Sequence, residues 1–202
     1  MDSVRQIPLP TKARLKYHMT PNQLATYNSL VKACRRRSCS PVEILKSTVK
    51  VCVFSNSAFV YKLLLNPVYL RETELFYTEA FGQNFVGSFS NACGTLLIMK
   101  KYGGVLSNEP HKSKLPRDFY GGIVGDIVHY HLHYVVHGDV KCDNIIMGRC
   151  GFWRLIDFGC MRHYFPSSDL VLKPCDFKRG TLVINVVPAF SNGDILLRDV
   201  CD

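Results

Sequence analysis

The spacing of apolar and polar residues in the first half of the chain predicts a series of short strands and helices. The runs over 48–54 and 58–65 have the pattern of two strands joined by a short polar turn. Residues 66–81 read as a helix that starts after a proline, and residues 85–89 and 95–102 are two further strand-like runs. The pattern predicts an antiparallel sheet interrupted by one helix, which is an α+β lobe.

Two more helices are predicted on either side of this lobe. A helix from about Pro21 to Ala33 is expected because Thr20 can cap its first turn and proline suits its first position. Residues 117–134 have helical periodicity, although three glycines interrupt them. Short apolar runs and turns follow up to residue 160, beyond which the chain reads as a loop.

Composition is typical of a globular protein. Of 202 residues, 47% are apolar and 20% charged, and no apolar run reaches the ~18 residues of a membrane helix. The first ten residues lack the apolar core of a secretory signal, and the nine cysteines are irregularly spaced without a C-x-x-C pair. These features predict an intracellular protein of the cytoplasm or nucleus with reduced thiols.

The positive charge is concentrated near the N-terminus. The net charge is +9, and residues 1–65 hold all of it, with eleven Lys or Arg and two acidic residues. This distribution suggests an electrostatic contact with an acidic protein, nucleic acid or nucleotide phosphates. A solvated basic surface explains the charge equally well, so nucleic acid is not our expected partner.

A dense polar segment stands out in the second half of the chain. The sequence HGDVKCDNIIM occupies 137–147, and DFG follows at 157–159 after a turn and a short apolar run. An ordinary polar loop explains any one of these residues but not the ordered set. Its carboxylate and amide oxygens are the hard donors that Mg²⁺ prefers.

This ordered set resembles the catalytic loop and metal-binding segment of serine/threonine protein kinases. The resemblance covers about 42–190 and implies an α+β, two-lobed protein-kinase-like fold. It implies a basic N-terminal extension (1–40), a small antiparallel-sheet lobe with one helix (41–104) and a truncated, mainly helical large lobe (105–202). Such a compact, diverged chain is similar to the kinases of large DNA viruses, which would place it in an infected host cell.

The resemblance implies that the chain transfers the γ-phosphoryl group of ATP to a protein hydroxyl. Asp139 would be the base that accepts or orients the hydroxyl proton, and Lys141 would neutralise charge on the moving phosphoryl group. Asn144 and Asp157 would hold the Mg²⁺ that bridges the nucleotide phosphates. Lys141 suits serine/threonine rather than tyrosine specificity.

The same resemblance implies nucleotide contacts in the smaller lobe. Lys62, in a V-A-I-K-like motif, would contact the α- and β-phosphates. Glu72 and Glu74 compete as its partner, and Glu72 is favoured because apolar residues follow it three and four positions later. Met99 would lie near the adenine, and Val49 would be the valine that ends the glycine-rich nucleotide-binding segment.

That glycine-rich segment is where the sequence departs most from the family. Counting back from Val49 places its glycine positions on residues that are not glycine: Val42, Ile44 and Ser47. Glycine lets backbone N–H groups approach phosphates closely, so its replacement is expected to weaken nucleotide binding.

Further departures concern regulation and the large lobe. Gly138 stands where the family usually has an arginine that binds a phosphorylated loop. Ala189 follows Pro188 where the family has a glutamate, and the chain stops at Asp202, before the usual last helices. We therefore expect either a partner chain that covers the surface exposed by the truncated lobe or marginal stability. We expect no membrane partner.

These departures leave two alternatives to an active serine/threonine kinase. One is a pseudokinase, a binding or competitor module for another kinase or its substrate. The other is a small-molecule phosphotransferase of the same fold, although Lys141 and Phe158 favour protein substrates. A Mg²⁺-dependent response to ATP distinguishes catalysis from simple binding.

Overall fold

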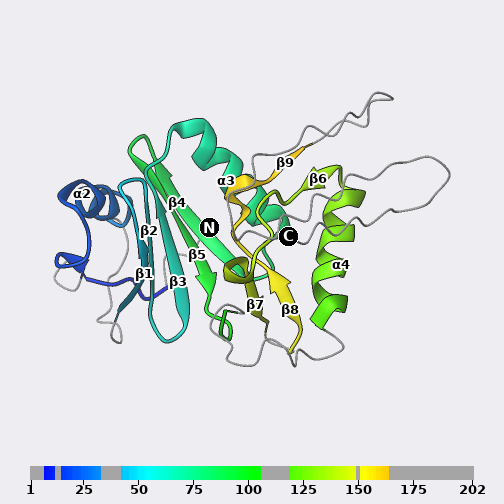
Figure 1. Cartoon of the computed structure of the whole chain (residues 1–202). Coiled ribbons are helices and arrows are strands. Elements are labelled where there is room, and N and C mark those ends of the chain that lie inside the picture. Colours follow the sequence, from blue (N-terminus) through cyan, green and yellow to red (C-terminus); the bar gives the residue numbers. More distant parts are fainter. Residues whose placement is uncertain (1–6, 12–14, 33–41, 106–118, 149–150, 164–202) are drawn as a thin grey trace. The chain divides into compact units, whose positions relative to one another are not determined.

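The computed structural model in Figure 1 describes residues 7–11, 15–32, 42–105, 119–148 and 151–163. These residues belong to two compact units, one within residues 1–101 and one within residues 102–202.

A five-stranded antiparallel sheet forms the first unit, with the strand order β1-β2-β3-β5-β4. The strands are β1 (Glu43–Ser47), β2 (Val51–Ser55), β3 (Phe59–Leu64), β4 (Phe85–Asn91) and β5 (Gly94–Lys100). The expected α+β lobe with an antiparallel sheet is therefore confirmed.

Strand β1 is absent from the sequence-based expectation, and the turn after it shifts the start of β2. The residues of β1 are mostly exposed at the sheet edge, so they lack an apolar alternation. The Thr48 hydroxyl accepts a hydrogen bond from the Val51 N–H at 3.1 Å and donates to the Val51 carbonyl at 3.2 Å. Val49 consequently lies in a closed turn with 82% of its surface exposed, and not on a strand.

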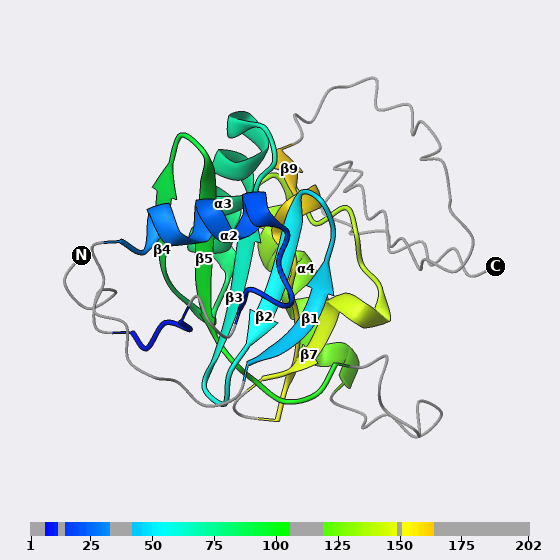
Figure 2. The ribbon, with the colours of Figure 1, turned by 90° about the vertical axis from the view of Figure 1, so that its left-hand side faces the viewer.

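The N-terminal segment covers one face of this sheet, and Figure 2 shows α2 (Pro21–Leu30) running across the strands. The helix begins as expected: the Thr20 side chain accepts from the Gln23 N–H, and the Gln23 side chain accepts from the Thr20 N–H. It ends at Leu30, three residues before the expected end.

Aromatic rings join the N-terminal segment to the sheet. Phe54 stacks on Tyr61 with ring centroids 5.1 Å apart, and Tyr27 meets Phe54 edge-on at 5.8 Å. The hydroxyls of Tyr27 and Tyr61 donate to the carbonyls of Pro10 and Pro8 at 2.8 and 2.5 Å. The described part of the expected N-terminal extension therefore shares the core of the sheet lobe.

Helix α3 (Val68–Phe81) lies on the opposite face of the sheet from α2 (Figures 1 and 2). It packs on β4 and β5. Its buried residues share one helical face: Arg71, Glu74, Tyr77 and Thr78. This helix therefore turns two charged residues toward the sheet.

In the described part of the second unit, one helix accompanies two small antiparallel pairs of strands, β7 with β8 and β6 with β9. Its elements are α4 (Phe119–Leu132), β6 (Val135–Val136), β7 (Ile145–Met147), β8 (Trp153–Leu155), β9 (Arg162–His163) and the 3-10 turns η4 (Cys142–Asn144) and η5 (Phe158–Cys160). Helix α4 packs on β8 and β6.

A buried carboxylate fastens α4 to β8. Asp126 accepts hydrogen bonds from the Arg154 guanidinium at 2.6 Å and from the Leu155 N–H at 3.0 Å. Burial raises the pKa of Asp126, and these two interactions, which lower it, only partly offset the effect. The contacts hold β8 in place, and β8 leads into DFG.

No helix in the described ranges combines the length and apolar character needed to cross a membrane. The segment 180–190, with Pro188 and Ala189, lies outside the described residues.

Candidate active site

The polar loop after β6 is held in place by a buried histidine. The Nε2 of His137 is 3.1 Å from the Ile156 carbonyl oxygen, and its Nδ1 is 3.3 Å from the backbone nitrogen of Asp139. These partners assign a neutral ring that donates from Nε2 and accepts at Nδ1. Burial lowers the pKa of His137 despite the opposing effects of the Ile156 carbonyl and of two nearby carboxylates. The ring is therefore neutral at neutral pH.

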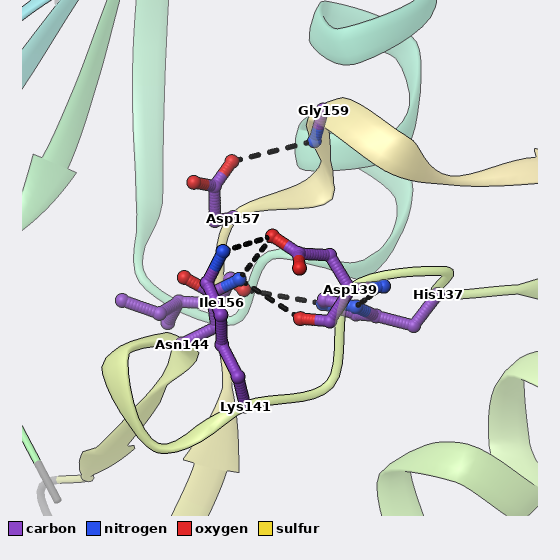
Figure 3. Close-up of polar contacts among 7 residues, drawn as sticks. All are labelled: His137, Asp139, Lys141, Asn144, Ile156, Asp157 and Gly159. Atoms are coloured by element: carbon purple, nitrogen blue, oxygen red, sulfur yellow. Dashed lines mark hydrogen bonds and ion pairs between the residues drawn. The ribbon is translucent and has the colours of Figure 1, made fainter. Parts of the chain in front are cut away.

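Three side chains of this loop form one hydrogen-bonded cluster, drawn in Figure 3. The Lys141 Nζ lies 2.6 Å from Asp139 Oδ2. The Asn144 Nδ2 donates to the same oxygen and to the Asp139 backbone carbonyl, both at 2.9 Å. One carboxylate oxygen is thus fixed from two directions.

Lys141 is charged in this cluster. Partial burial alone would lower the pKa of Lys141, but the hydrogen bond to Asp139 and the charges of Asp139 and Asp157 outweigh it, so the pKa lies above its usual value. The negative charge of Asp157 contributes to this higher pKa of Lys141, as the charge of Asp139 does.

Asn144 is buried and held by both its backbone and its side chain. Its N–H donates to the Lys141 carbonyl at 2.9 Å, and its own carbonyl accepts from the Ile156 N–H at 2.8 Å. Because both side-chain hydrogen bonds use Nδ2, the amide oxygen takes part in neither. That oxygen is the atom of Asn144 that could bind a cation.

Asp157 follows β8 in a left-handed conformation, with φ 68°, which aspartate tolerates better than most residues. Its Oδ1 accepts from the Gly159 N–H at 3.4 Å and caps η5. The next residue, Phe158, is buried edge-on against His137 and Tyr130, with centroid distances of 5.8 and 6.2 Å. The aromatic contacts anchor the DFG segment beside the polar loop.

The amide oxygen of Asn144 and the carboxylate of Asp157 fit a magnesium ion by their chemistry. Mg²⁺ usually takes one or two side-chain oxygens from a protein, and phosphates and water complete its shell. Within the described ranges, no group of three or more His, Cys, Asp or Glu side chains gathers as a metal site.

In the first unit, the structure pairs Lys62 with Glu74 and not with the favoured Glu72. The Lys62 Nζ lies 2.5 Å from Glu74 Oε1, and the two side chains are 12% and 6% exposed. Glu72 is exposed on the other side of α3. The apolar residues after Glu72 were a poor guide, because one of them, Phe76, is itself 56% exposed.

The residues paired directly with Lys62 in the sheet are apolar. Lys62 lies opposite Val53 on β2 and Leu97 on β5, and Val60 lies opposite Met99. Directly paired residues, and residues two apart on one strand, share a face. Met99 therefore lies on the same face as Lys62, as its expected role requires.

Strand pairing places three β2 residues on the Lys62 face, opposite Leu64, Lys62 and Val60: Val51, Val53 and Ser55. Val49, which the family resemblance favoured as the nucleotide-contacting valine, is in the exposed turn. The Thr48 side chain that closes the turn was the sequence signal that could have placed the start of β2 correctly.

The conformation of Gly138 explains why an arginine is absent beside Asp139. Its φ is +77°, and a Cβ at this position would lie 2.7 Å from the Cys160 carbonyl oxygen. A side chain would meet backbone of the DFG segment and would be strained. The close packing of these two segments depends on glycine.

The comparisons with known proteins give relatives at low identity, and no protein-family model matches the chain. A probable serine/threonine-protein kinase of Dictyostelium discoideum is 25% identical over 148 residues, which cover 65% of this chain and 30% of that protein. A probable cyclin-dependent kinase 10 of the same organism is 30% identical over 69 residues, covering 34% and 18%. The chain thus spans less than a third of these curated relatives.

Among solved structures, a crystal structure of WbdD is similar with a TM-score of 0.50 at 18% identity, covering 64% of this chain and 34% of that one. WbdD is described as a bifunctional kinase-methyltransferase. The fold is therefore kinase-like. The fold and the names of the curated relatives together indicate that this chain is a kinase-like protein.

Proposed function

We propose that the chain carries the nucleotide-binding and catalytic residues of a serine/threonine protein kinase that uses Mg-ATP. The proposal rests on one observation: Asp139, Lys141 and Asn144 form a single hydrogen-bonded cluster in the second unit. Phosphoryl transfer needs positioning and charge stabilisation more than covalent chemistry, and this cluster offers both.

Asp139 is our proposed base. The hydrogen bonds from Lys141 and Asn144 both end on Oδ2, so neither occupies Oδ1. The Asp139 N–H donates to His137, which fixes the backbone behind the carboxylate. We propose that Oδ1 accepts the proton of a serine or threonine hydroxyl as the oxygen attacks phosphorus.

Lys141 is proposed to neutralise the phosphoryl group, since its raised pKa keeps it charged at neutral pH. Asn144 and Asp157 are the proposed magnesium ligands. When bound, the ion would offset the negative charge of the nucleotide phosphates. These residues would then orient the phosphates for transfer.

In the first unit, Lys62 is our proposed ligand of the α- and β-phosphates. Glu74 holds its ammonium group at 2.5 Å and so limits its conformations. The half-buried Val53, Val60 and Met99 share the face of Lys62, and we propose that they contact the adenine.

The test is transfer of ³²P from γ-labelled ATP to dephosphorylated casein in the presence of Mg²⁺. Asp139→Asn is expected to reduce the rate by about 10²–10⁴-fold, the usual contribution of a general base. Asp143→Asn is the matched control, because Asp143 is an exposed acid of the same loop, and it should retain activity within a few-fold. Equal incorporation by wild type and Asp139→Asn would refute the assignment. Label on tyrosine would refute the serine/threonine specificity.

A second function, that of a pseudokinase that binds partners, is favoured by the β1–β2 turn. This turn holds no glycine and is closed by the hydrogen bonds of Thr48, so its backbone offers less access to phosphates. Thermal unfolding with ATP, with and without Mg²⁺, separates the two functions. The kinase predicts a Mg²⁺-dependent rise in Tm that Asp157→Ala abolishes, whereas the pseudokinase predicts no such rise.

A further inference from the structure

We infer that Arg71 is a positioning residue that keeps Glu74 at Lys62 by tying α3 to the turn between β4 and β5, and that α2 braces this turn. The inference deepens the proposed function, because it rests on the proposed role of Lys62 in nucleotide binding. Each contact in this series lies within the first unit.

Arg71 joins α3 to the turn directly. It is buried, with 4% exposure, and its Nη1 and Nη2 donate to the carbonyls of Asn91 and Ala92 at 3.1 and 3.0 Å. Arg71 precedes Glu74 by three residues and lies on the same buried face of α3. A rotation or shift of α3 that moved Glu74 away from Lys62 would therefore stretch both hydrogen bonds.

The chemistry of Arg71 favours positioning over simple stability. Its guanidinium is buried against neutral carbonyls, and its Nε has no hydrogen-bond partner within the described part of the chain. Desolvating such a group is costly, and an apolar side chain would avoid that cost. Two directional hydrogen bonds to backbone carbonyls instead fix the orientation of the helix.

The β4–β5 turn that receives Arg71 is itself held rigid. The Oδ1 of Asn91 accepts from the N–H groups of Cys93 and Gly94 at 2.8 and 3.1 Å. Its Nδ2 donates to the hydroxyl of Ser29 on α2 at 2.9 Å, and that hydroxyl donates to the Thr26 carbonyl at 2.9 Å. The turn is thus closed on itself and attached to α2.

Close packing reinforces this attachment. A Cβ on Gly94 would lie 2.5 Å from Thr26 Cγ2 and 3.0 Å from the Leu64 carbonyl oxygen. Helix α2 therefore rests directly on the start of β5. These contacts lead from α2 through the turn to Arg71, and the backbone of α3 connects Arg71 to Glu74, which pairs with Lys62. The chain's own N-terminal segment thus preorganises the ion pair, as supporting contacts do at functional sites.

The experiment measures the acylation rate of Lys62 by trace acetic anhydride and mass spectrometry, without nucleotide and well below the Tm. Loss of two hydrogen bonds to a charged group is expected to raise the Lys62 rate about tenfold in Arg71→Met. Arg71→Lys, which keeps the charge, should be intermediate. Glu72→Gln, a change at the adjacent exposed residue, should match wild type. The exposed Lys46 is the internal reference.

An Arg71→Met protein that has a lower Tm but an unchanged Lys62 rate would overturn the inference, since Arg71 would then be merely structural. If Arg71→Met does not fold, Ser29→Ala provides the test. Loss of its neutral hydrogen bond should raise the Lys62 rate about threefold, and an unchanged rate would overturn the inference equally. Because no nucleotide is present, failure of the wild type to bind ATP would refute the proposed function and leave this result standing.

Discussion

Removing the charge of Glu74 should destabilise the first unit far more than removing that of Glu72, two residues away on the same helix. Lys62 and Glu74 are 12% and 6% exposed and 2.5 Å apart. Breaking a buried ion pair by removing one partner costs about 3–5 kcal/mol. Glu74→Gln keeps the side-chain shape and a hydrogen-bonding oxygen, so we expect about 3 kcal/mol. Glu72→Gln, on the exposed face, should change the free energy of unfolding by less than about 0.5 kcal/mol.

Urea unfolding at pH 7 measures this difference. The slope with urea should stay constant between variants, so that the loss appears as a lower midpoint. A double variant, Lys62→Met with Glu74→Leu, should recover most of the loss because neither charge then remains buried without the other. Equal midpoints for Glu74→Gln and Glu72→Gln, or a double variant that loses the sum of the single effects, would refute the reasoning.

Three further predictions concern the two units separately. Gly138→Ala should lower the free energy of unfolding by about 1–3 kcal/mol in urea, because φ is +77° and a Cβ would meet the Cys160 carbonyl oxygen. Gly125→Ala is the control: it lies in α4 with open space around it and should be neutral or stabilising by about 0.5–1 kcal/mol. A similar loss of stability at both sites would argue against backbone strain at Gly138. Thr20→Ala should cost about 1 kcal/mol through loss of the α2 cap, as measured by the thermal midpoint, and an unchanged midpoint would count against the cap. The free energy of unfolding should fall as pH drops below about 6.5. The unfolded chain takes up a proton at the ordinary histidine pKa, whereas burial lowers the pKa of His137 in the folded state. The free energy of unfolding should depend less steeply on pH in His137→Asn, and an identical dependence would exclude this residue as a cause.

Elements set by local signals could be predicted from the sequence. The Thr20–Pro21 pair marks the start of α2 because capping depends on adjacent residues only. The segment expected to be a helix over 66–81 is α3 at Val68–Phe81. The loop at 137–144 is also local, so its Asp, Lys and Asn could be expected to lie close together.

Features that depend on contacts between distant parts of the sequence could not be predicted. Helix α3 buries Arg71 and Glu74 and exposes Phe76, so hydrophobic periodicity pointed to the wrong glutamate. Strand β1 is an exposed edge strand, whose residues had no burial to impose a pattern. In the sequence, Gly138 was notable only because the kinase family usually has an arginine at this position. The approach of the Cys160 carbonyl, which only the structure reveals, shows why glycine is required there.

The most direct test of the central claim is a crystal structure of the protein with Mg²⁺ and a non-hydrolysable ATP analogue. We expect the ion to be bound by the Asn144 Oδ1 and by a carboxylate oxygen of Asp157, each at about 2.0–2.1 Å, with the analogue's γ-phosphate facing Asp139. An ion bound by other residues, or an analogue bound away from these three side chains, would contradict the assignment of this cluster as a phosphoryl-transfer site.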